Sequence, residues 1–118
     1  MAKSTTIPKT YEKMRRFKRY HYDVRMQVSV FREGANIRLW GRTSEVGLDG
    51  IGATLTGELM TGEVVSLEFP VSFAPWVMKV RAIVRYSDGL RCGFEFLVVT
   101  HQQREMMRRL SDGLEHTP

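Results

Sequence analysis

The sequence lacks a set of cysteines, a long apolar run and an apolar N-terminal segment. The single cysteine, Cys92, cannot form an internal disulfide framework, and such sparse cysteine usage is typical of a reducing compartment. The longest apolar runs span only a few residues, as at 73–76, which Pro75 interrupts, so we expect no membrane insertion. No apolar stretch follows the basic N-terminus, which argues against a secretory signal peptide. Together these absences predict a cytoplasmic protein.

The chain nevertheless contains enough apolar material to fold. Its 118 residues fit one domain of ordinary size, and a hydrophobic fraction of 42% excludes wholesale disorder. Residues 1–10 show no periodicity, and apolar alternation begins only after Asp23. We therefore predict a flexible basic arm at 1–13, a single domain at 14–114 and a short tail at 115–118.

Positive charge is concentrated at the N-terminus. The chain carries a net charge of +5, and residues 1–25 hold eight basic and two acidic residues, a net charge of +6. The remainder therefore carries a net charge of −1, with ten basic and eleven acidic residues. A basic arm on a near-neutral body indicates an anionic partner, which could be nucleic acid, an acidic membrane surface or a small phosphate ligand.

The body of the chain has the period-two alternation of half-buried strands. Six segments show it, at 24–30, 37–42, 51–55, 64–69, 78–86 and 90–96. Turn residues at 33–36, 61–62 and 87–89 separate several of them. The stretch 44–52 contains Gly47, Gly50 and Gly52, which predicts a loop with unusual backbone angles.

The end of the chain changes to a helical period. Thr100 and Gln103 match a capping box, and the apolar side chains that follow share one helical face: Met106, Met107, Leu110 and Leu114. Six short antiparallel strands followed by one amphipathic helix predict a mainly β fold. The strands close most simply into a small barrel or sandwich, with the helix over an open end.

No constellation for catalysis or metal binding is visible. Cys92 and the three histidines lack metal-ligand spacing, and Cys92 alternates with core residues and has no base placed beside it. Glu45 and Asp49 suit turn positions better than an acid–base pair. The glycines at 47–52 are not followed by the Lys-Ser or Lys-Thr of a phosphate-binding loop. We therefore expect neither an enzyme nor a bound metal.

Two features remain without an explanation: the cluster Arg15-Arg16-Phe17-Lys18-Arg19 and the glycine-containing stretch 44–52. An arginine fork can grip two acceptors, either phosphate oxygens or O6 and N7 of guanine. A glycine-rich segment lets the backbone approach a ligand closely. In an antiparallel barrel these two segments can meet and form one site.

This arrangement resembles a PilZ domain, the bacterial receptor module for cyclic di-GMP (c-di-GMP), over residues 14–110. The family's first motif is Arg-x-x-x-Arg directly before the first strand, matched here by Arg15 and Arg19 with the frequent second arginine at Arg16. The segments 23–28 and 89–96 are similar to the family's opening and closing strands. The resemblance implies a six-stranded antiparallel barrel with a C-terminal helix.

The family's second motif, Asp/Asn-x-Ser-x-x-Gly, is altered in this chain. Residues 45–50 match Gly50 outright, but Glu45 stands in place of Asp or Asn and Gly47 in place of Ser. In the family the acidic residue and the serine contact a guanine. Loss of one neutral hydrogen bond is worth roughly 0.5–1.5 kcal/mol, about a twofold to twelvefold loss of affinity. Ser44 and Asp49 offer further polar groups nearby.

The resemblance implies a c-di-GMP receptor or adaptor. Arg15, Arg16 and Arg19 would bind the phosphates and guanines, residues 45–50 would bind a guanine edge, and the arm would become ordered on binding. One alternative is a degenerate PilZ domain that binds no nucleotide and contacts a protein partner through residues 73–76 or 104–114. A second alternative, a nucleic-acid binder stacking bases on Phe31 and Trp40, is disfavoured by the near-neutral body.

Overall fold

The structure, a computed structural model, describes residues 17–97 and 99–115. The predicted arm at 1–13, Arg15, Arg16 and the tail residues 116–118 lie outside this part of the chain. Its elements are β1 (Tyr20–His21), β2 (Arg25–Arg32), β3 (Ala35–Val46), β4 (Gly50–Leu55), β5 (Val64–Pro70), β6 (Val77–Asp88), β7 (Arg91–Phe96) and α2 (His101–Glu115).

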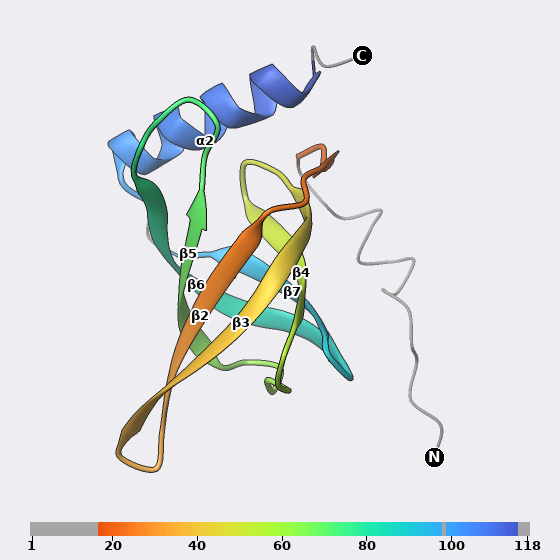
Figure 1. The fold of residues 1–118 in the computed structure, drawn as a ribbon, viewed down its shortest axis with the longest axis vertical. Helices are drawn as coiled ribbons and strands as arrows, with labels where there is room; N and C mark the ends of the chain where they lie inside the picture. Colours follow the sequence, from red (N-terminus) through yellow and green to blue (C-terminus); the bar gives the residue numbers. More distant parts are fainter. Residues whose placement is uncertain (1–16, 98, 116–118) are drawn as a thin grey trace.

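The strands form a closed barrel. Hydrogen bonding joins β3, β2, β5, β6, β7 and β4 in that order, all antiparallel, and β4 pairs back onto β3 (Figure 1). The two-residue β1 pairs with the end of β3, beside the position where β2 begins. Closure leaves none of the six main strands with a long free edge. The predicted six-stranded antiparallel barrel with a C-terminal helix is confirmed.

The core follows the alternation read from the sequence. Inward positions of β2 and β6 are buried, and they are occupied by Met26, Val28, Val30, Met78, Val80, Ala82 and Val84. Cys92 lies fully buried on β7, as predicted. The strand predicted at 90–96 would begin with Leu90 on the same face as Cys92, but Leu90 lies in the turn before β7 and is 45% exposed. That expectation was wrong because β6 continues to Asp88 and moves the turn towards Leu90.

The β2–β3 hairpin turns where the sequence predicts. Glu33 and Gly34 both have positive φ, 50° and 79°, as a two-residue type I′ turn requires. Pairing resumes at once, since Arg32 faces Ala35 across the hairpin. Figure 1 shows this hairpin at the end of the barrel opposite α2.

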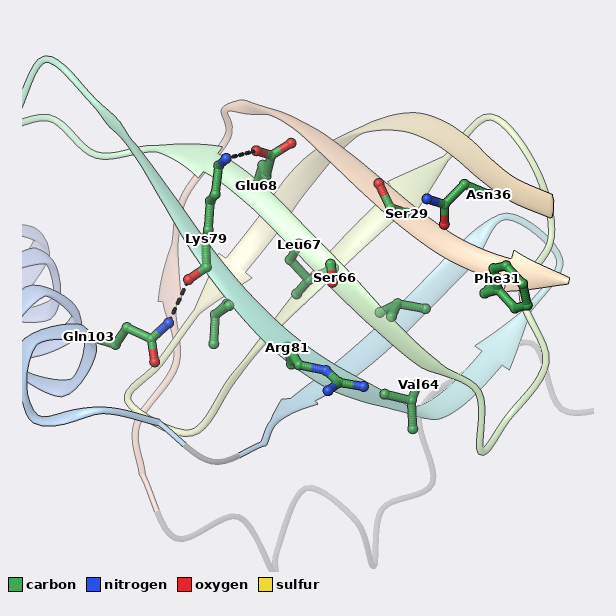
Figure 2. A pocket seen from close by; sticks show the side chains of 12 residues that line it. Ser29, Phe31, Asn36, Val64, Ser66, Leu67, Glu68, Lys79, Arg81 and Gln103 are labelled. Carbon is green, nitrogen blue, oxygen red and sulfur yellow. Dashed lines mark hydrogen bonds and ion pairs between the residues drawn. The ribbon is translucent and has the colours of Figure 1, made fainter. Parts of the chain in front are cut away.

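α2 lies across one open end of the barrel (Figure 1). Its capping box is complete: the Thr100 amide donates to Gln103 Oε1 at 2.9 Å, and the Gln103 amide donates to Thr100 Oγ1 at 3.1 Å. Met107 and Leu110 are buried side chains of α2. Gln103 Nε2 also donates to the Lys79 carbonyl oxygen at 2.6 Å, which ties the start of α2 to β6 (Figure 2). No helix in the described part of the chain is long and apolar enough to cross a membrane.

Candidate functional site

The stretch predicted to be a long loop is mostly strand. β3 continues to Val46 and β4 begins at Gly50, so only three residues separate them, and the Gly47 amide donates to the Gly50 carbonyl oxygen at 2.9 Å. The described glycines with positive φ are Gly34, Gly62 and Gly89. The prediction of unusual backbone angles at Gly47, Gly50 and Gly52 was therefore wrong.

These glycines provide space for an arginine side chain. A Cβ on Gly47 would lie 2.7 Å from Arg19 Cδ and 2.6 Å from the Lys18 carbonyl oxygen. A Cβ on Gly50 would lie 2.9 Å from Arg19 Nη2 and 2.1 Å from the Phe94 carbonyl oxygen. Both positions are too close for any side chain, so the bare backbone of the β3–β4 turn is what admits Arg19.

Arg19 lies between two carboxylates of this turn. Its Nη1 is 3.5 Å from Glu45 Oε1 and its Nε is 3.4 Å from Asp49 Oδ1. The Arg19 side chain is only 6% exposed, whereas Glu45 and Asp49 remain 29% and 26% exposed. Arg19 Nε and Asp49 Oδ1 are buried and face each other without hydrogen-bond geometry. The three charges sum to −1, so this cluster alone does not attract an anion.

A break in the first strand directs Arg19 to the turn. β1 and β2 pair with the same side of β3 but are offset, and the intervening residues 22–24 form no regular ladder. The Thr43 side chain supplies hydrogen bonds to the backbone of these residues. Its hydroxyl donates to the Tyr22 carbonyl oxygen and accepts from the Val24 amide. Thr43 is 3% exposed, so this pairing is internal to the fold. The break lets residues 17–19 run beside the β3–β4 turn.

A pocket of about 600 Å³ opens beside the Arg19 cluster. It lies between the start of the described chain, the β3–β4 turn, the end of β7 and α2, and its lining comprises Phe17, Leu48, Asp49, Glu95, Phe96, Val99, Arg104 and Arg108. A second hollow, of about 500 Å³, lies on the outer surface of β2, β5 and β6 (Figure 2). That hollow contains no residue of either sequence motif. The pocket beside the Arg19 cluster does, so we take it as the candidate site.

The described residues give little support for nucleophilic or metal chemistry. Burial raises the pKa of the Cys92 thiol, which keeps it protonated and inert. Within residues 17–97 and 99–115, no three His, Cys, Asp or Glu side chains are grouped so that they could hold a metal ion. The side chains that line the candidate pocket are either charged, at Asp49, Glu95, Arg104 and Arg108, or apolar, at Phe17, Leu48, Phe96 and Val99.

Comparison with known families decides the identity of the fold. The sequence profile of the PilZ domain family matches residues 13–113, most of the chain. The chain belongs to the PilZ domain family. A comparison with curated protein sequences finds no significant match.

Solved PilZ structures share this fold. The PilZ domain of CeSA from a cellulose-synthesising bacterium superposes with a TM-score of 0.65 at 20% identity, covering 84% of this chain and 99% of the other. The PilZ domain of YcgR from Escherichia coli, solved with c-di-GMP, gives 0.66 at 19% identity, covering 86% and 92%. MotI/DgrA of Bacillus subtilis gives 0.63 at 17% identity, where this chain spans 53% of the longer protein.

Four of the six predicted PilZ motif residues meet in the structure. Arg19 of the first motif lies against Glu45, Gly47 and Gly50 of the second. Arg15 and Arg16 lie outside the described residues. Asp49, which the sequence offers only as a further polar group near the second motif, also lies beside Arg19, with its Oδ1 3.4 Å from Arg19 Nε. Phe17 belongs to the arginine cluster that the sequence singles out. Arg104 carried no signal for ligand binding in the sequence, because only the folded barrel brings α2 beside the motif turn.

Proposed function

We propose that this PilZ domain is a receptor for c-di-GMP that acts by binding and not by catalysis. The observation that carries the proposal is the position of Arg19, the end of the first motif, which lies 3.5 Å from Glu45 and 3.4 Å from Asp49 on the turn of the second motif. Two sequence-distant motifs that resemble the family's ligand site therefore form one local structure.

The charges favour a division of roles between the two motifs. Ionised carboxylates only accept hydrogen bonds, so Glu45 and Asp49 suit the N–H donors of a guanine. The phosphates need cations beyond the Arg19 cluster, because that cluster carries a net charge of −1. Arg15 and Arg16 directly precede this cluster in sequence, and their planar forks suit phosphate oxygens and the guanine O6 and N7 acceptors.

Arg19 has a different role in this proposal. It is buried and already paired, so it anchors the first motif to the turn and orients the two carboxylates. From that anchor the preceding arginines close over the ligand and change the surface offered to a protein partner. The fold shared with the YcgR domain solved with c-di-GMP supports a c-di-GMP receptor in general terms.

Isothermal titration calorimetry with c-di-GMP tests the proposal. We expect saturable heat with the wild-type protein below about 100 µM ligand, a free energy of roughly −5.5 kcal/mol or better. Arg15→Ala should abolish the heat, while Arg38→Ala, which removes one exposed cation from β3, should leave it unchanged. Absence of heat with the wild-type protein would contradict the proposal.

One observation favours a second candidate, a PilZ adaptor that binds a protein partner without nucleotide. Both turn carboxylates already have a cation partner in Arg19, and Gly47 lacks the serine hydroxyl of the family motif. In that case the calorimetric titration shows no heat, and the turn has a structural role alone.

A further inference from the structure

The pocket beside the β3–β4 turn has walls from four parts of the chain: the start of the described residues, the turn itself, the end of β7 and α2. Phe17 contributes from within the first motif and Asp49 from within the second, while Arg104 and Arg108 contribute from α2. Only the segments of Phe17 and Asp49 belong to the two ligand motifs of the family. α2 therefore forms one wall of the same pocket, and no role in ligand binding has yet been assigned to this helix.

The pocket lining suits a nucleotide. Leu48, Phe96 and Val99 form an apolar surface, and Phe17 is 39% exposed beside it, so a planar base can stack there. Two guanidinium groups of α2, those of Arg104 and Arg108, line the same pocket. Apolar or aromatic surface for a base next to guanidinium groups for a phosphate is the combination that a nucleotide needs.

The two helix arginines differ in their existing partners. Arg108 is held by two carboxylates of its own helix, Glu105 and Asp112, which neutralise it. Arg104 donates a long hydrogen bond of 3.4 Å to the Val99 carbonyl oxygen, and it has no carboxylate partner within the described residues. Its positive charge is therefore available to an anionic group that enters the pocket.

We propose that α2 is part of the nucleotide site and that Arg104 binds a phosphate of the ligand. The inference rests on the proposed c-di-GMP function. In this arrangement Asp49, which lines the pocket, and Glu45, which shares Arg19 with it, accept hydrogen bonds from a guanine, and Arg104, which also lines the pocket, meets a phosphate. Ligand binding then bridges the barrel and the helix that covers its open end.

Calorimetry with c-di-GMP and a pair of matched variants tests this proposal. Arg104→Gln removes the cation from the pocket and should raise Kd about tenfold, as expected for loss of a charge-assisted hydrogen bond. Arg109→Gln removes the same charge from the same helix, but its guanidinium lies over the Phe73 ring at 4.3 Å, outside the pocket. This control should keep Kd within about twofold. Thermal unfolding of both variants verifies that each is folded.

The possible results separate this proposal from the one on which it rests. Wild-type binding that Arg104→Gln weakens and Arg109→Gln does not would support the helix wall. Wild-type binding that Arg104→Gln leaves unchanged, or that both variants weaken equally, would overturn this inference and leave the c-di-GMP function standing. No wild-type binding would overturn both.

Discussion

Arg19 links the two motifs because its side chain fills space that two glycines leave open. It is 6% exposed between Glu45 and Asp49, and neither Gly47 nor Gly50 could carry a side chain without displacing it or the backbone nearby. A residue whose sequence position indicates ligand binding is thus also part of the fold. Its two roles separate when stability and binding are measured independently.

Arg19→Gln should lower the free energy of unfolding by roughly 1–3 kcal/mol, because it leaves two nearby carboxylates without their cation. Urea unfolding measures the difference. The matched control is Arg42→Gln, whose ion pair with Asp23 is exposed, at 62% and 54%, and should be worth under about 1 kcal/mol. Equal effects of the two variants would show that Arg19 is not held as the structure indicates.

Gly47→Ser restores the serine of the family motif, yet it should destabilise this protein. The new Cβ would lie 2.6 Å from the Lys18 carbonyl oxygen and 2.7 Å from Arg19 Cδ, and such overpacking costs about 1–3 kcal/mol. Gly113→Ser on α2 is the control, since a Cβ there meets nothing within 4 Å. A Gly47→Ser variant as stable as the wild type would contradict the packing of Arg19 against the turn.

Among the elements, the end of β2 is tied to the connection before β5 by an ion pair. Arg32 Nε donates to Glu63 Oε2 at 2.8 Å and its Nη2 to Oε1 at 2.6 Å, while the Met60 amide donates to the same carboxylate at 2.7 Å. These hydrogen bonds, chiefly the one from Arg32, hold the pKa of Glu63 below its ordinary value of 4.5. The carboxylate therefore stabilises the fold only while it is ionised.

Glu63→Gln should lower the stability by about 1 kcal/mol at pH 7. Because the pKa is lower in the folded state, this difference is fully present above about pH 4.5 and shrinks as the pH falls further. Urea unfolding of both proteins between pH 3 and pH 7 measures it. Glu68→Gln, which removes the more exposed pair with Lys79, is the control and should have a smaller effect. A difference independent of pH would contradict the ionic account.

The elements themselves are largely predictable from the sequence. Alternation placed all six main strands, and the capping box at Thr100 placed the start of α2, because local burial pattern and end chemistry decide both. The backbone of the stretch 44–52 was mispredicted because a glycine can be required for two structural reasons that look alike in sequence. It can supply a positive φ, or it can yield space to a distant side chain, and only the tertiary position of Arg19 distinguishes them.

In the whole molecule, one end of the barrel gathers segments that are far apart in sequence. The start of the described chain, the β3–β4 turn and α2 meet there (Figure 1). The family motifs predicted the first two, whereas the helix wall depends on how the barrel closes. The structure also changes how the charge is interpreted. Residues 1–25 carry a net charge of +6, but Arg19 together with Glu45 and Asp49 forms a cluster with a net charge of −1.

The two barrel ends provide internal controls for a binding measurement. Gly47 and Gly50 lie on the motif turn, whereas Gly34, Gly62 and Gly89 occupy turns away from it. Glycine amides are therefore reporters on both the candidate site and the rest of the molecule.

An NMR titration of ¹⁵N-labelled protein with c-di-GMP tests the central claim most directly. We predict saturable shifts of the Gly47, Gly50 and Arg19 amides, with the Gly34, Gly62 and Gly89 amides unchanged. A spectrum that c-di-GMP leaves unaltered, or shifts confined to those three distant turns, would contradict the assignment of this end of the barrel as the ligand site.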